Sequence, residues 1–186
     1  MGREYEGIDV RLAGFLLRQP VFFVGTAPLD AEGHVNVSPK GMSGSFAVVD
    51  EHRVAYLDLT GSGIETVAHL RENGRIVVMF CAFAGPPRIV RLHGRGETHL
   101  PGSDGFEELR PLFPDQPGTR SIIEVEVARI ADSCGYAVPE MTYVKDRQRL
   151  TYWAEAKERD GALTAYQTEN NATSLDGLPG LPGPDG

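Results

Sequence analysis

A glycine-flanked turn is the feature of this sequence best suited to binding an anion. A predicted strand over residues 53–59 leads through a Gly-Ser-Gly turn, residues 61–63, directly into a predicted helix. Backbone N–H groups at a helix start, reinforced by the helix dipole, bind phosphate groups, and glycines let a ligand approach the backbone closely. Hydroxyl donors would come from Thr60, Ser62 and Thr66. The alternative is an ordinary tight turn in which Ser62 caps the helix.

A second candidate is the run Ser38-Pro39-Lys40-Gly41. We expect Pro39 to break a strand at this point. Lys40 on the resulting kink would reach an anionic ligand, and Gly41 would leave room for a flat ring against the backbone. The alternative is a strand end that carries a solvated lysine.

The third candidate is a strand over residues 88–100. Its period of two places Arg91, His93 and Arg95 on one face and Val90 and Leu92 on the other. One face is therefore predicted to pack in the core while the other presents positive charge. An ordinary solvated strand face explains the pattern equally well.

Other chemistries have little support. The five histidines show no ligand spacing for zinc, so no metal site is predicted, and we expect each of them at the surface or capping a helix. The sequence also lacks the G-x-S-x-G motif of hydrolases.

Composition narrows the class of protein. The 186 residues are 41% hydrophobic and 24% charged, which is typical of one globular domain. The net charge of -8, with scattered lysines and arginines, argues against a nucleic-acid partner. The longest apolar run, residues 76–85, is too short to cross a bilayer, and the charged N-terminus does not resemble a secretory signal. We therefore expect a cytoplasmic protein without a membrane partner.

The pattern of elements predicts a mainly β fold. Strands are expected at residues 21–26, 34–37, 46–49, 53–59, 75–83, 88–100 and 121–130, and helices at 10–17, 64–73, 106–112 and around 152–156. Many strands with few helices favour an antiparallel barrel that is closed or nearly closed. We expect a single domain over residues 1–176. A Gly/Pro-rich tail over residues 177–186 is expected to be extended and to dock on a partner subunit.

Taken in order, several segments resemble the pyridoxamine 5'-phosphate oxidase-like family of FMN-binding split barrels. They are Pro20-Val-Phe-Phe-Val-Gly-Thr-Ala, Val37-Ser-Pro-Lys-Gly, Tyr56-Leu-Asp-Leu-Thr and residues 69–80. Residues 133–141, Trp153 and residues 175–181 are similar to one uncharacterised branch of that family.

The resemblance implies a homodimer of split barrels with FMN in a cleft between the two chains. By position, Ser38, Pro39, Lys40 and Gly41 would line the flavin. The residues expected near the ribityl phosphate are Leu59, Thr60, Ser62, Glu65 and Thr66, with Arg91 supplying positive charge.

Two departures argue against pyridoxamine phosphate oxidase activity itself. Ile64-Glu65-Thr66 stands where the family's enzymes typically have Ser-Arg-Lys, and a carboxylate there repels a phosphate. The Gly/Pro tail also replaces the family's arginine-bearing C-terminal segment.

We therefore predict an FMN-dependent oxidoreductase acting on a small molecule, with no catalytic residue assigned. The alternatives are a non-catalytic protein that binds or carries a flavin, the deazaflavin F420 or haem, and a dimeric scaffold without a ligand.

Overall fold

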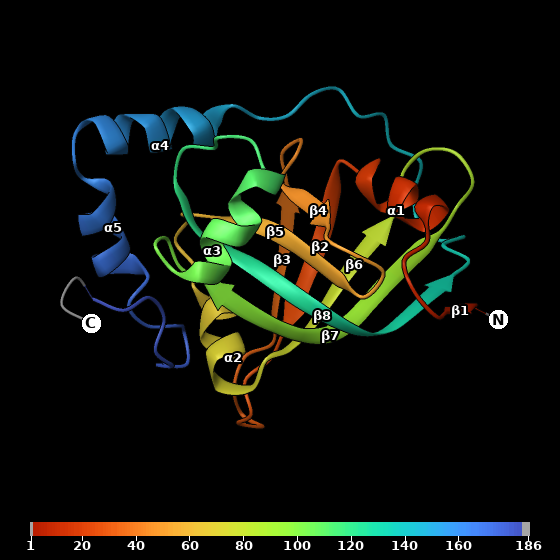
Figure 1. Ribbon diagram of the computed structural model, residues 1–186, viewed down its shortest axis with the longest axis horizontal. Helices are drawn as coiled ribbons and strands as arrows, with labels where there is room; N and C mark the ends of the chain where they lie inside the picture. Colours follow the sequence, from red (N-terminus) through yellow and green to blue (C-terminus); the bar gives the residue numbers. More distant parts are fainter. Residues whose placement is uncertain (1, 184–186) are drawn as a thin grey trace.

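Eight antiparallel strands form one curved sheet in a computed structural model that describes residues 2–183 (Figure 1). The strands are β1 (Glu4–Tyr5), β2 (Val21–Thr26), β3 (Asn36–Gly41), β4 (Phe46–Val48), β5 (Arg53–Leu59), β6 (Arg75–Cys81), β7 (Ile89–His99) and β8 (Thr119–Ser133). The helices are α1 (Val10–Leu17), α2 (Glu65–Asn73), α3 (Asp104–Leu109), α4 (Arg149–Arg159) and α5 (Leu163–Asn170), with a short 3-10 turn at Arg110–Leu112.

The sheet is an open path rather than a closed ring. Its strands follow the order β3-β2-β6-β7-β8-β5-β4, and β1 pairs with β8 outside this path. Strands β3 and β4 therefore stand at its two ends, which makes this mainly antiparallel fold a split barrel, as the sequence predicts.

An aromatic cluster fills the inside of the sheet. Phe22 of β2 stacks on Phe80 of β6 at 5.5 Å between ring centroids and meets Tyr56 of β5 edge-on at 5.5 Å. These rings are buried because alternate residues of each strand point inward. Helix α1 adds Leu12 and Leu16 to the same core.

The proline of β3 does not break its strand. The predicted strand over residues 34–37 lies instead at Asn36–Gly41, and Pro39 pairs with Phe23 of β2 in the middle of it. This expectation was wrong because β3 is the end strand of the path, and an edge strand tolerates a residue that donates no backbone hydrogen bond.

The helices largely agree with those predicted from the sequence. The predicted helices at residues 10–17 and 64–73 are present as α1 and α2, whereas α5 and the two-residue strand β1 were not expected.

The first part of the Gly/Pro tail lies against α2 of its own chain. There the Gly180 carbonyl accepts a hydrogen bond from Arg71, and Leu181 packs on the core. The expected extension over residues 184–186 lies outside the described residues.

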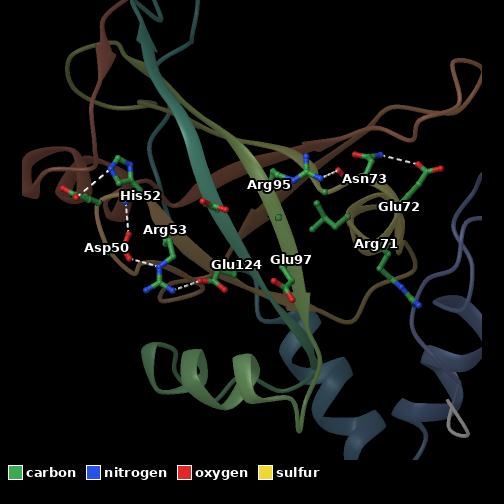
Figure 2. A pocket seen from close by; sticks show the side chains of 14 residues that line it. Asp50, His52, Arg53, Arg71, Glu72, Asn73, Arg95, Glu97 and Glu124 are labelled. Carbon is green, nitrogen blue, oxygen red and sulfur yellow. Dashed lines mark hydrogen bonds and ion pairs between the residues drawn. The ribbon is translucent and has the colours of Figure 1, made fainter.

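The outer face of β5, β7 and β8 carries charged side chains. Together with the C-terminal end of α2 they line an open groove of about 1170 Å³ (Figure 2). Charges of both signs pair there, for example Arg53 with Glu124 at 3.1 Å and with Asp50 at 2.7 Å. Among residues 2–183 no group of histidine, cysteine, aspartate and glutamate side chains is arranged to hold a metal ion.

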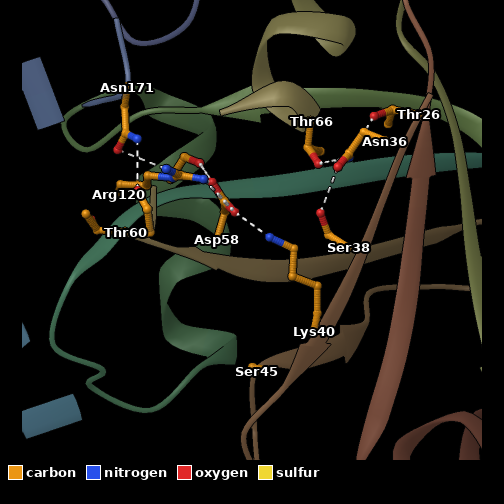
Figure 3. Close-up of polar contacts among 12 residues, drawn as sticks. Thr26, Asn36, Ser38, Lys40, Ser45, Asp58, Thr60, Thr66, Arg120 and Asn171 are labelled. Carbon is orange, nitrogen blue, oxygen red and sulfur yellow. Dashed lines mark hydrogen bonds and ion pairs between the residues drawn. The ribbon is translucent and has the colours of Figure 1, made fainter. Parts of the chain in front are cut away.

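A buried charge cluster links β3, at one end of the sheet path, to β5 and β8 near the other end (Figure 3). The Asp58 carboxylate of β5 accepts from Lys40 Nζ of β3 at 3.0 Å and from Arg120 Nε of β8 at 2.7 Å. Arg120 in turn donates to the side chain of Asn171 at 2.9 Å, after α5. Burial alone would raise the pKa of Asp58, but Lys40 and Arg120 together hold that pKa well below its usual range.

Replacing Asp58 by asparagine is expected to destabilise the fold strongly. The change keeps the shape of the side chain but leaves two cations with no carboxylate, and breaking a buried ion pair costs about 3–5 kcal/mol. Urea denaturation of the wild type and the variant measures this loss. The matched control Asp50→Asn removes an exposed carboxylate paired with Arg53 and should change stability far less. A loss below about 1 kcal/mol for Asp58→Asn would show that the cluster does not hold the fold.

The same cluster predicts a pH dependence. The folded-state pKa of Asp58 is depressed, so ionisation of this carboxyl contributes to the stability of the fold. The contribution is fully present above the pKa that Asp58 has in the unfolded chain, about 3.9, and is lost as the pH falls below that value. The stability difference between wild type and Asp58→Asn should therefore be roughly 1 kcal/mol smaller at pH 3 than at pH 7. An equal difference at both pH values would contradict the assignment.

Candidate functional site

A cavity of about 830 Å³ lies between the ends of β3 and β5 and the start of α4. Its lining comprises Pro20, Val21, Pro39, Lys40, Gly41, Met42, Leu57, Leu59, Lys145, Asp146, Arg147, Arg149, Leu150 and Trp153. Four of the ten residues predicted for the cofactor site are among them: Pro39, Lys40, Gly41 and Leu59.

Strand alternation gives the cavity an apolar floor. Pro39 is in register with Phe23 on the outer side of the sheet, whereas the adjacent Lys40 is in register with the buried Phe22. Lys40 therefore sends its ammonium inward to Asp58. The side chains that remain at this floor are prolines and aliphatic residues, including Leu57 and Leu59.

Three cations on the segment that leads into α4 and on its first residue also line the cavity. Lys145, Arg147 and Arg149 are exposed, and no ion pair or side-chain hydrogen bond within residues 2–183 involves them. The one carboxylate of the lining, Asp146, accepts a hydrogen bond from the backbone N–H of Ser43 at 3.0 Å. The cavity therefore carries an excess of positive charge in a chain whose net charge is -8.

Trp153 is the only tryptophan of the protein, and it lines this cavity. It is half-buried and packs edge-on against Tyr166 of α5, with 4.8 Å between ring centroids. A positioned aromatic ring beside an apolar floor is suited to a planar ligand.

A smaller cavity of about 460 Å³ adjoins the first. The two share Pro20, Gly41, Met42 and Asp146 in their linings. Met42 has a φ of 78°, a left-handed conformation that side chains other than glycine rarely adopt. Strained backbone of this kind is concentrated at functional sites.

Two further predicted residues belong to a polar cluster on the inner side of β3 (Figure 3). Asn36 donates to Thr66 of α2 at 3.1 Å and accepts from Ser38 at 3.0 Å. It also donates to Thr26, which is hydrogen-bonded to His69 at 3.0 Å. The lysine-bearing strand and the helix after the glycine turn are therefore direct neighbours, although Ser38 and Thr66 do not line the cavity.

The glycine turn itself is engaged by the C-terminal part of the chain. Thr60 is buried and hydrogen-bonded to Gly118 and Gln167, and Asn171 donates to the Gly61 carbonyl. Ser62 is exposed and does not cap α2, because the helix begins after Ile64 with no side-chain cap. The alternative in which Ser62 serves as the N-cap was therefore wrong.

Glu65 and Arg91 also lie outside the cavity lining. The Glu65 carboxylate accepts from the backbone N–H of Leu175 at 3.4 Å. Arg91 lies on the outer face of β7, as the strand pattern predicts, and donates to Ser133 at 3.1 Å.

One histidine differs from the sequence prediction. His69 of α2 is fully buried rather than exposed, and its Nε2 has no hydrogen-bond partner among the described residues. Burial lowers the pKa of this imidazole, so the ring is neutral at pH 7.

Sequence reasoning missed the cations of residues 145–149. The available signal was the Lys145-Asp-Arg-Gln-Arg149 run, which places three positive charges within five residues just before Trp153. Its proximity to β3 could not be read from the sequence, because residues 134–148 cross the molecule from β8 to α4 without a helix or strand over most of their length (Figure 1).

None of the helices within residues 2–183 has the length and apolar character needed to span a membrane.

Known proteins with similar sequences and folds place the chain in a family. The family model for pyridoxamine 5'-phosphate oxidase matches residues 8–134. The pyridoxamine 5'-phosphate oxidase family protein ustO of Aspergillus flavus is 42% identical over 193 residues, which cover 95% of this chain and 77% of that protein.

Two solved structures share the fold. HupZ of Group A Streptococcus superposes with a TM-score of 0.52 at 19% identity, covering 73% of this chain and 99% of that one. A protein of Mesorhizobium loti named as FAD-binding superposes with a TM-score of 0.50 at 15% identity, covering 71% of this chain and 95% of that one. With the family match and the ustO identity, these likenesses lead to one conclusion: the chain belongs to the pyridoxamine 5'-phosphate oxidase family.

Proposed function

We propose that this protein binds FMN in the cavity between β3, β5 and α4 and acts as an FMN-dependent oxidoreductase on a small molecule. The observation that carries the proposal is the cavity itself. It combines the Pro39-Lys40-Gly41 run and Leu59 with a tryptophan and an excess of cations. Its volume of about 830 Å³ lies within the usual range for small-molecule and cofactor sites.

The lining fits a phosphorylated aromatic ring system. Leu57, Leu59 and Pro39 offer an apolar surface to a planar ring, and Trp153 offers an aromatic one. The excess of arginine and lysine suits the phosphate. The name of the Mesorhizobium loti protein, which describes FAD binding, supports a flavin as the ligand.

Bound FMN would supply the electron transfer, and the protein would supply binding and orientation. Trp153 and the floor residues would hold the ring and exclude water from one side of it. The adjoining cavity at Met42 would admit a small substrate beside the ring. We assign no acid or base, because Lys40 is paired with Asp58 and Asp146 is held by the Ser43 N–H.

That same observation supports a second candidate, a protein that carries a flavin, a deazaflavin or haem without turnover. An enzyme would consume a reductant in the presence of some electron acceptor, whereas a carrier would bind its ligand and remain inactive across a broad panel of acceptors.

Purified protein is expected to be yellow, or to become so on addition of FMN. Because its single tryptophan lines the cavity, occupancy should quench tryptophan fluorescence saturably. Titration with FMN, followed both by this quenching and by the flavin absorption spectrum, measures the binding.

The variant Leu59→Arg serves as the test of location, because it places a bulky charged group on the apolar floor. It should weaken FMN binding at least tenfold, whereas Leu29→Arg, at an exposed leucine outside the cavity, should leave it unchanged. A colourless protein that takes up no FMN would defeat the proposal.

We further propose that two chains associate around this cavity. Exposed large apolar side chains lie on or next to two of the segments that contribute to its lining. One group lies on or just before β3, namely Val35 and Val37. The other lies on the segment that leads into α4 and on its first turn, namely Tyr136, Met141, Tyr143, Val144, Leu150 and Tyr152. Exposed apolar surface marks interaction sites, and the family resemblance makes a second copy of this chain the expected partner.

The variant Val37→Glu should weaken this dimer. Val37 is 64% exposed on the outward side of β3, so a carboxylate there disturbs an interface but not the core. Light scattering after size-exclusion chromatography should give twice the chain mass for the wild type and a shift toward one chain mass for the variant. Val10→Glu, at another exposed valine on α1, is the matched control and should remain dimeric. A wild-type monomer at micromolar concentration would contradict this proposal.

A further inference from the structure

The helix start at which the sequence predicts a phosphate site is poorly suited to a phosphate. Glu65 occupies the first turn of α2, and its carboxylate adds negative charge where an anion would approach. Residues of the C-terminal segment also contact this helix start, through the Leu175 N–H to Glu65 and through the close approach of Gly180 to Ile64.

The two basic residues predicted from the sequence are also engaged elsewhere. Lys40 Nζ lies 3.0 Å from the fully buried Asp58 carboxylate, so its ammonium group is held on the inner side of the sheet. Arg91 donates to Ser133 on the outer face of β7 and does not line the cavity.

Three other cations line the cavity without a partner of their own within residues 2–183: Lys145, Arg147 and Arg149. They lie within five residues, and the single acid among them, Asp146, is bound by the Ser43 N–H. Arginine side chains bind phosphate oxygens through two parallel N–H groups, which makes them strong phosphate ligands.

We infer that Lys145, Arg147 and Arg149 form the phosphate-binding part of the cofactor site and that they replace the cations missing from the start of α2. The inference rests on the proposed flavin function. The apolar floor at Leu57 and Leu59 then takes the ring, and the segment leading into α4 takes the phosphate. This arrangement explains how a carboxylate at position 65 is compatible with a phosphorylated ligand.

The arrangement predicts that the protein distinguishes FMN from riboflavin, which has the same ring and no phosphate. The experiment measures the dissociation constants of both by tryptophan quenching in wild type and in the double variant Arg147→Gln/Arg149→Gln. We expect the wild type to prefer FMN. The double variant should bind FMN at least tenfold more weakly and should bind riboflavin with an affinity within about twofold of the wild type. Lys145→Gln alone should show the same trend with a smaller loss.

Two control variants separate charge from position. Arg159→Gln removes one positive charge at the far end of α4, outside the cavity, and should leave both dissociation constants unchanged. Glu65→Gln keeps a hydrogen-bond acceptor for Leu175 but removes the negative charge at the start of α2, and it too should change FMN binding little.

The outcomes are distinct. If the wild type binds neither ligand, the proposed function fails and this inference fails with it. If the wild type binds FMN but the double variant keeps the same preference over riboflavin, only this inference is overturned. A tenfold gain in FMN binding by Glu65→Gln would overturn it as well, because the phosphate would then lie at α2. Since Arg147 and Arg149 are exposed and form no ion pair or side-chain hydrogen bond within residues 2–183, circular dichroism should show the double variant folded.

Discussion

The buried carboxylate of Asp58 is the constraint on which the arrangement of this molecule depends. A sheet whose hydrogen-bonded path is open needs another interaction to hold its two sides together. The ion pair from Lys40 of the end strand β3 to Asp58 of β5, the neighbour of the other end strand, provides one. Arg120 makes the burial of this charge tolerable, and Asn171 extends the cluster to the C-terminal part of the chain. An uncompensated charge at this depth would be costly, so all four groups stabilise the fold only together.

This cluster also determines what the cavity contains. Because Lys40 turns inward, the outer side of β3 presents Pro39 and leaves the floor beside Leu57 and Leu59 apolar. The positive charge of the cavity comes instead from residues 145–149, a segment that crosses the molecule before α4 begins. The family's split barrel thus supplies the floor, while a part of the chain outside the barrel supplies the polar groups.

Local patterns predicted much of this fold. The period of two in residues 88–100 placed Val90 and Leu92 inside and Arg91 outside, and the helix predicted at residues 10–17 is present as α1. The path of β3 through Pro39 could not be predicted, since a proline is tolerated there only because the strand lies at the end of the sheet. The partners of Lys40 and the neighbours of Trp153 depend on contacts between residues far apart in sequence, which no local pattern records.

The position of Asn171 bears on how the protein is made. Strands β2 to β8 precede it in the chain, yet the Asp58 cluster is complete only when this side chain reaches Arg120 and the Gly61 carbonyl. The ribosome synthesises these segments in order. The barrel would therefore emerge before the buried charges of the Asp58 cluster have all their hydrogen-bond partners, and it would reach its final structure only after translation has passed α5. Early termination of synthesis would therefore yield a barrel with all its strands but a weakened junction, a form that cellular quality control would be expected to remove.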